Sequence, residues 1–492
     1  MRTNFNKLLK ALAAIMLMPF LLACATYNKR IQGYYGYMAA GNYVAANQAL
    51  DNIKLLKKQR NLFLYKVEKG RVMQLLKQYD TSNMYLNEAD HLAEDARTSA
   101  SDVAVGTLVN PMMQPYKPEA FEKFMLHYYK AINYLQLGKR DEALVEARRI
   151  TIQANEQNYK YGDKTNRYSK DAFSFILQGV IYESAGDINN AFIAYRNAAE
   201  TYLAVPSNTW YGVHIPEQLK QDVLRTAYAN GFMDEVSRFE KLFNITYQPQ
   251  ANPPGGELIY FVEKGRVAVK GEQNISFVLS RNGLGNFFFS DQNSSLQVPF
   301  DFSVGINASD LAKYKLETFR IALPKYIPQA AYYTQQYITN NGAFINPEKV
   351  QDISTLAIET LRERFLKELG LALSRLAVKK IAEFLIRGSE SKKDSVVVGK
   401  NGETTTVPKS KTSSIREGIA TALEIYSFFS EKADTRNWQS LPADIYMARI
   451  PLELGENKVA LILSNGRSKE DSVTVMVKGT GKLQFYNYTS LR

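Results

Sequence analysis

The sequence has few of the residues that most often carry chemistry in proteins. Its 492 residues include one cysteine and three histidines. A single cysteine, Cys24, excludes an internal disulfide and any cysteine metal site. The histidines, His91, His127 and His214, lie far apart in the sequence, and none belongs to a His-Glu-x-x-His zinc motif. The sequence therefore predicts neither a metal site nor a cofactor.

Motifs of nucleophilic catalysis and of phosphate binding are also missing. No Gly-x-Ser-x-Gly elbow occurs. The stretch 479–482, Gly-Thr-Gly-Lys, ends like a phosphate loop, but Leu483 stands where Ser or Thr must hold the metal ion. We therefore predict no catalytic residue and no enzyme. Scattered carboxylates such as Glu217 and Asp222 leave one alternative open, a hydrolase or transferase that acts on peptidoglycan through a site in the C-terminal domain.

The charge balance is basic, but the basic residues form no dense block. Lys and Arg number 61 against 49 Asp and Glu, so the formal net charge is +12. This balance suits a protein close to anionic lipid or to an acidic polymer. Because no dense basic block occurs, nucleic acid is not expected as a partner.

A long apolar run lies near the N-terminus. Basic residues within 1–10 precede an uncharged run, 11–23, which ends immediately before Cys24. This layout is that of a secretory signal. It resembles the bacterial lipoprotein signal, which implies a signal peptide over 1–23 and lipidation, for example with palmitate, at Cys24. Ala25 resembles the residue found after the cysteine in lipoproteins of the outer membrane. We therefore expect a protein anchored there that faces the periplasm.

Small residues recur between residues 171 and 206 with the spacing of a helix pair. Gly179 and Ala191 are small enough for two helices to approach closely, and Gly186 supplies the turn between them. These offsets are close to those of a tetratricopeptide unit. Weaker copies of the frame place equivalent small residues at Ala46, Ser82 and Ala143. We predict a tetratricopeptide-like solenoid over 24–248. The alternative is a helical bundle that only supports the second half of the chain, since a repeat pattern shows packing and not a ligand.

The pattern changes at a Pro- and Gly-rich stretch, 249–256, which predicts a linker. Short alternating runs of β-branched and aromatic residues follow it and return near the C-terminus. The predicted strands include 257–262, 275–279, 298–304, 319–323, 445–450, 459–463, 473–477 and 483–488. We assign residues 249–330 and 436–492 to one antiparallel, sandwich-like β domain.

Residues 331–435, between these two segments, predict a helical insertion. Apolar residues at helical spacing indicate one helix over about 350–386 and a second over about 413–432. The stretch 388–412, rich in Ser, Lys, Gly and Thr, predicts a mobile loop. The expected fold class is α+β: an N-terminal α-solenoid followed by an antiparallel β-sandwich-like domain with a helical insertion.

Two short segments resemble a known family. Residues 433–438 have the sequence Ala-Asp-Thr-Arg-Asn-Trp and precede Leu441-Pro442, and residues 322–326 are Ala-Leu-Pro-Lys-Tyr. Together they are similar to a poorly characterised family of bacterial lipoproteins with helical repeats before a β-rich C-terminal part. The resemblance implies a location and an architecture but no activity.

Within the first of these segments, an acid, a base and a large aromatic residue have two interpretations. We expect Asp434 and Arg436 to form a charge pair and Trp438 to act as an aromatic plug. Because Arg and Trp are also typical binding anchors, a ligand site is the alternative.

Helical-repeat proteins commonly serve as scaffolds that bind a partner in a concave face. Tyr, Asn and Gln side chains suit the recognition of an extended peptide. We expect Tyr129, Asn133 and Gln178 to be exposed on that face and to bind a protein of the cell envelope. The predicted function is therefore a lipid-anchored scaffold, with the membrane held through Cys24 and peptidoglycan as a further candidate ligand.

Overall fold

The computed structural model describes most of the chain outside the N-terminal signal. The described residues are 27–98, 112, 114–161, 171–281, 283, 286–291, 297–299, 318–362, 365, 369–370, 373, 397–398, 404–405, 433–466 and 470–492. Cys24 lies outside them, as do most of the predicted loop 388–412 and all of the predicted helix 413–432. The expectations for these segments therefore remain predictions.

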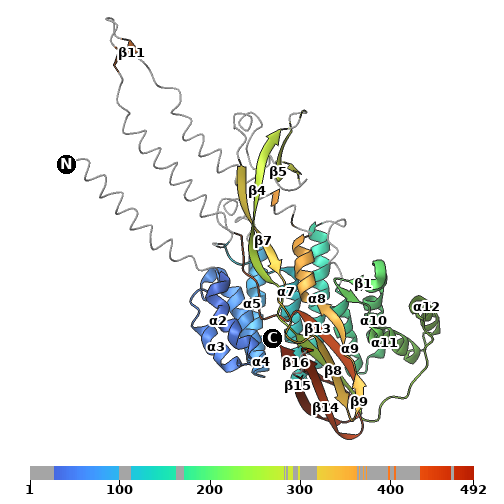
Figure 1. Cartoon of the computed structure of the whole chain (residues 1–492). Helices are drawn as coiled ribbons and strands as arrows, with labels where there is room; N and C mark the ends of the chain where they lie inside the picture. The colour runs from blue at the N-terminus through green and yellow to red at the C-terminus, as the bar shows by residue number, and fades with distance from the viewer. Residues whose placement is uncertain are drawn as a thin grey trace.

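Helices that pack in consecutive pairs form the N-terminal half (Figure 1). The pairs are α2 (Tyr27–Ala39) with α3 (Tyr43–Asp51), α4 (Leu62–Leu75) with α5 (Tyr79–Thr98), α7 (Ala120–Gln136) with α8 (Arg140–Tyr161), α9 (Ala172–Ser184) with α10 (Ile188–Leu203), and α11 (Glu217–Ala229) with α12 (Met233–Phe243). Short helices η1 (Gln59–Asn61) and η3 (Pro206–Asn208) and the two-residue strands β1 (Thr209–Trp210) and β2 (Val213–His214) lie between them.

Small residues allow the helices of a pair to approach closely, as the spacing predicts. A Cβ atom added at Gly179 on α9 would lie 2.3 Å from the Tyr195 ring on α10. The turn between these helices contains Gly186, whose φ is +80°, a conformation that favours glycine. Asp187 then caps α10, because its side chain accepts a hydrogen bond from the Asn190 backbone N–H at 3.0 Å. Local sequence thus explains the helix pairs.

Two four-stranded sheets form most of the C-terminal half. The central sheet has the order β10 (Glu348–Asp352), β13 (Asp444–Pro451), β3 (Gly256–Lys264) and β16 (Lys482–Ser490). The second sheet has the order β15 (Glu470–Gly479), β14 (Gly455–Ser464), β8 (Gln335–Asn340) and β9 (Ala343–Ile345). β16 runs parallel to β3, whereas the other neighbours in these sheets are antiparallel.

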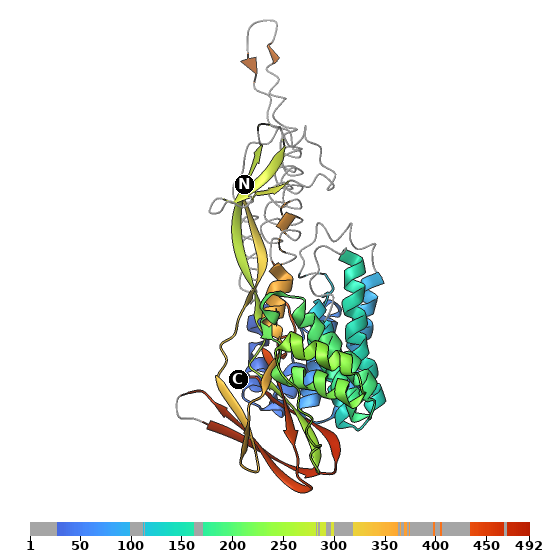
Figure 2. The same cartoon turned by 90° about the vertical axis from the view of Figure 1, so that its right-hand side faces the viewer.

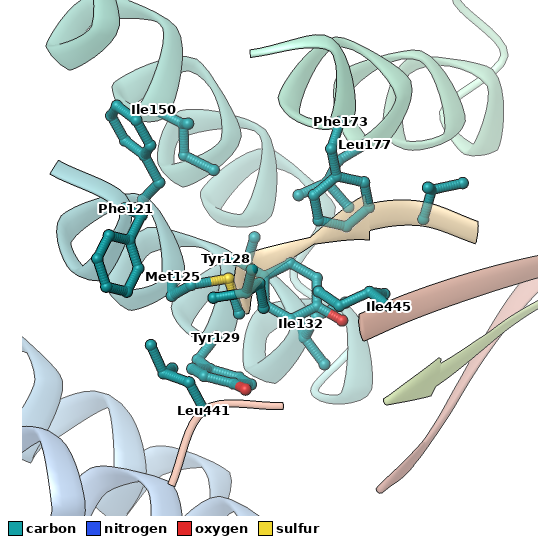
Figure 3. Close-up of a cluster of buried hydrophobic side chains, with 14 of the residues drawn as sticks. Phe121, Met125, Tyr128, Tyr129, Ile132, Ile150, Phe173, Leu177, Leu441 and Ile445 are labelled. Carbon is teal, nitrogen blue, oxygen red and sulfur yellow. The ribbon is translucent and has the colours of Figure 1, made fainter. Parts of the chain in front are cut away.

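Both faces of the central sheet are covered, one by the helices and the other by the second sheet (Figure 2). Side chains alternate along β3, so Ile259 and Phe261 pack among the helices, and Leu258, Tyr260 and Val262 pack against the second sheet. On the helical side, Figure 3 shows aromatic and aliphatic residues of α7 and α9 next to β13. The expected sandwich is present only in part, with a third layer of helices on one face. It includes strands β8, β9 and β10 from the predicted helical insertion and the parallel pair β16–β3, whereas the described strands within 269–327, which were assigned to it, form a separate sheet.

A third antiparallel sheet forms an arm that projects from the body (Figure 1). Its strands, in the order β6, β5, β4 and β7, are β4 (Val269–Arg281), β5 (Phe287–Asp291), β6 (Gln297–Pro299) and β7 (Thr318–Ile327). A separate apolar cluster stabilises this arm. The cluster includes Phe277, Phe289, Ile321 and Leu323 from the strands, and Leu369 and Leu373 from the chain that follows β10. Two short paired strands, β11 (Val397–Val398) and β12 (Thr404–Thr405), are also described.

The predicted domain boundaries need two corrections. The predicted linker 249–256 is exposed and irregular over 249–252, but its end is packed, because a Cβ atom at Gly255 would lie 2.2 Å from the Glu453 carbonyl oxygen and one at Gly256 would lie 2.3 Å from that of Lys482. The two halves also share one apolar core, which runs from Tyr27 to Leu491. The predicted helical insertion, 331–435, begins instead with strands β8, β9 and β10, and its helix starts at residue 353.

Candidate functional site: an extended segment in the groove of the helices

The three residues predicted to bind a partner are buried inside the protein. Tyr129 and Asn133 are 0% exposed and Gln178 is 8% exposed. The Tyr129 ring lies 5.8 Å from the ring of Trp438 and 4.2 Å from the guanidinium of Arg71. The expectation of an exposed binding surface at these positions was therefore wrong, because the C-terminal half of the same chain covers Tyr129 and neighbouring helices cover Asn133 and Gln178.

Hydrogen bonds between neighbouring helices account for the two amides. Asn133 donates to the Ser82 hydroxyl at 2.9 Å and to the Asn83 side-chain oxygen at 2.8 Å, which links α7 to α5. Gln178 donates to the Thr151 hydroxyl at 2.7 Å, which links α9 to α8. Both side chains therefore hold adjacent helix pairs together.

A segment without helix or strand, 433–442, which turns at 439–441, packs against the helices where the partner was expected. Helical carboxylates accept its backbone N–H groups: Trp438 N–H donates to Glu122 on α7 at 2.8 Å, and Gln439 N–H donates to Glu68 on α4 at 3.2 Å. The Trp438 side chain is fully buried, and its indole N–H donates to Ser440 at 2.8 Å. The helices thus hold this segment through its backbone, in the way that grooves hold peptides.

The charge pair expected in this segment is present. The Arg436 guanidinium donates to both carboxylate oxygens of Asp434, at 2.9 and 2.7 Å. It also donates to the Asn61 side chain at 2.9 Å and to the Gln114 carbonyl at 3.0 Å. Burial disfavours the charged guanidinium, but the hydrogen bond and charge of Asp434 outweigh it and raise the pKa of Arg436. The predictions of a charge pair and an aromatic plug at Trp438 are confirmed.

A second polar cluster joins the helices to the central strand. Arg71 of α4 forms a fully buried ion pair with Glu263 of β3 and donates to the Thr489 hydroxyl of β16 at 3.1 Å. Tyr128 donates to Glu263 at 3.1 Å, and Asn487 donates to it at 3.2 Å. Because every oxygen of the carboxylate has donors, the buried charge of Glu263 is compensated.

A third cluster lies at the other end of the same interface. Arg449 of β13 contacts Glu183 of α9 at 2.8 Å and Asp222 of α11 at 3.2 Å. Burial alone would raise the pKa of Glu183, but the charges of Arg449 and Arg225 lower it to about 2. Nearby, Glu348 of β10 accepts the first two backbone N–H groups of α11, both at 2.8 Å. A carboxylate at a helix N-terminus stabilises the helix dipole.

The two carboxylates that hold the 433–442 segment behave differently from Glu183. Burial, together with the neighbouring charge of Glu119, raises the pKa of Glu122 to about 7. Burial also raises the pKa of Glu68, although the Tyr34 and Tyr35 hydroxyls donate to it at 2.8 and 2.5 Å. These two acids therefore accept protons more readily than ordinary carboxylates do.

The described chain also contains a buried histidine cluster and a small cavity. Within the described ranges, no group of three or more His, Cys, Asp and Glu side chains is arranged to hold a metal ion. His127 is buried between Glu146, at 2.7 Å, and Asp90, at 3.7 Å, with Lys130 beside both acids. A cavity of about 10 Å³ next to Phe121 and Phe173 has room for about one water molecule.

Sequence analysis missed the residues that join the two halves. Glu263 and Arg449 each adjoin or interrupt a run of mainly apolar residues, and a charge at such a position was the signal available, whereas Arg71 lies among other charged residues and gave none. Their partners could not be identified, since Arg71 and Glu263 are 192 residues apart.

Among the described helices, none combines the length and the hydrophobicity that a membrane crossing requires. No protein-family model matches the chain. No curated protein matches it either. Two crystal structures titled as MamA are similar over 44% and 45% of this chain and 92% and 96% of their own, with 14% and 13% identity and a TM-score of 0.26 each. A likeness at that score carries no argument about fold or function.

Proposed function

We propose that this protein is a lipid-anchored scaffold of the bacterial cell envelope, attached to the outer membrane through Cys24 and facing the periplasm. The N-terminal signal pattern and the basic net charge of +12 support this location. The helix pairs, with small residues at their closest approach, support a tetratricopeptide-like repeat and therefore a role in protein binding.

The inner face of the helices is already occupied, and this determines which surface we propose for partner binding. Because the protein's own segment 433–442 occupies the inner face of the helices, a partner must bind elsewhere on them. The last helix, α12, lies at the edge of the molecule (Figure 1) and exposes Met233 and Leu242 by 49% and 47%. We propose that a protein partner binds at this end of the series.

Lipidation is tested with Cys24→Ser. Wild-type protein should incorporate labelled palmitate and sediment with the outer membrane, whereas Cys24→Ser should do neither, because several acyl chains are needed for stable anchoring. Unchanged labelling or unchanged maturation of Cys24→Ser would refute the anchor.

Partner binding is tested by crosslinking in intact cells, followed by purification and mass spectrometry. The double variant Met233→Asp with Leu242→Asp should lose the captured protein while its melting temperature stays close to wild type, since exposed substitutions usually change stability by at most about 0.5 kcal/mol. Val44→Asp on α3 is the matched control, because Val44 is 60% exposed at the opposite end of the helices. Equal capture by the double variant would exclude the α12 surface.

A further inference from the structure

Strand β15 (Glu470–Gly479) forms an edge of the second sheet. Among the described residues, its ladder partner is β14, and the two strands pair without a bulge over ten positions, from Gly455–Gly479 to Ser464–Glu470. The Lys478 carbonyl accepts a hydrogen bond from the Gln484 side chain at 2.8 Å. Between Ser472 and Met476, no backbone hydrogen bond to an element other than β14 is present in the described chain.

Natural proteins usually protect such an edge with proline, charge, a bulge or a covering element. Two other edge strands of this protein follow that rule: β7 carries Pro324 and Lys325, and β10 is short and has a register shift between Lys349 and Gln351. In contrast, the stretch Ser472–Val477 on β15 contains no charge, no proline and no glycine. This edge is therefore long, regular and open to another strand.

We propose that β15 pairs with β15 of a second copy of this chain, antiparallel and symmetric about Thr474. This register places Val473 opposite Val475 of the other copy, and Ser472 opposite its Met476. The two-fold axis thus creates two valine pairs, each between Val473 of one copy and Val475 of the other. Pairs of β-branched residues stabilise antiparallel strands. The two four-stranded sheets would then form one continuous sheet.

Charge selects a second copy in this orientation. The acidic residue Glu470 begins β15, and Lys478 stands near its end. In the register about Thr474, position 470 of each copy lies opposite Lys478 of the other copy, whereas in-register parallel pairing would place like charges together. The strand is thus complementary to itself, and Met476, 59% exposed, would be covered in the pair.

Thr474→Cys tests the symmetry directly. The axis places this position beside itself, and the native sequence has only Cys24, which the lipid occupies in the proposed function. Full-length protein carrying Thr474→Cys should form a disulfide-linked dimer in membranes under mild oxidation. Lys458→Cys, on the adjacent strand β14, is the matched control and should stay monomeric. Absence of the link, or equal linking of both variants, would overturn the proposal.

Variants that place a charge at position 474 test the dimer independently. Detergent-solubilised wild-type protein should be a dimer by sedimentation. Thr474→Lys and Thr474→Glu should each dimerise roughly tenfold more weakly, because like charges meet at the axis. Mixing the two variants should restore a heterodimer. A wild-type monomer at all concentrations, or unchanged dimers of both variants, would refute the pairing. A different envelope protein crosslinked at β15 in place of a second copy would refute it as well.

Discussion

The two faces of the central sheet are built differently, although the same strands supply both. On β3, the side facing the helices carries Glu263, and the neighbouring β13 adds Arg449. The side facing the second sheet packs apolar residues and tyrosines, among them Leu258, Tyr260 and Leu461. The helices present charged side chains to the sheet, so the strands that pack against them, β3 and β13, carry residues of opposite charge. A sheet that meets another sheet needs only complementary shape.

The largest expected effect comes from breaking the buried ion pair on the helical face. Glu263→Ala leaves Arg71 buried without its carboxylate, so unfolding should become easier by about 3–5 kcal/mol. Urea denaturation of the purified protein measures this loss. Replacing both residues, with Glu263→Leu and Arg71→Met, should recover much of the stability. A loss below about 1 kcal/mol for Glu263→Ala would show that the pair is not buried as described.

On the opposite face, Leu461→Ala should destabilise the protein only because it leaves a cavity. Leu461 is 0% exposed within the sandwich. Removal of a buried leucine side chain commonly costs about 2–5 kcal/mol. Unlike Glu263→Ala, this variant leaves no buried charge behind, so Arg71→Met should not restore its stability. Recovery of Leu461→Ala by Arg71→Met would remove the distinction between the faces.

The helical face should also respond to pH. The pKa of Glu122 is raised to about 7 from its ordinary value of 4.5, so the folded protein binds more protons than the unfolded chain between these values. Stability should therefore fall by about 3 kcal/mol from this group as the pH rises from about 4.5 to 7, and it should change little above pH 7. Glu122→Gln keeps an acceptor for the Trp438 N–H and should flatten that decline in denaturation midpoints measured across this range. An identical slope in both proteins would contradict the assignment.

The smallest effect is expected for Tyr260→Phe, on the sandwich side of β3. The Tyr260 hydroxyl is buried and forms no hydrogen bond with a described residue. Its removal should therefore change stability by less than about 0.5 kcal/mol, or increase it slightly. A loss above about 1.5 kcal/mol in the same urea assay would reveal a polar partner on this face.

Patterns that depend on near neighbours were predicted correctly. Gly179, Gly186 and Ala191 specify a helix pair because helix contact and turn conformation involve residues a few positions apart. Alternation likewise predicted β13 and β14. The strands at 335–352 were missed, since short polar runs such as Gln335–Asn340 alternate weakly and the strong helical pattern after them dominated the assignment.

The candidate site was predicted only in part. The segment 433–438 drew attention through its composition, and the Asp434–Arg436 pair lies two residues apart, within reach of local reasoning. Tyr129 and Gln178 were expected to be exposed because a helix pattern shows which side chains share a face but not what covers it. Gln178 is covered by the neighbouring helix α8, and Tyr129 is covered by Trp438 from the far end of the chain.

The sequence by itself determined the helix pairs, the alternating strands and the local charge pair, because each depends on interactions within one or two structural elements. Only the tertiary structure decided that the groove of the helices is filled by the protein's own C-terminal half. That outcome rests on pairs such as Arg71 with Glu263 and Trp438 with Glu122, the second separated by 316 residues. Such pairings between distant residues cannot be predicted from periodicity, because each residue fits the helix or strand pattern of its own segment.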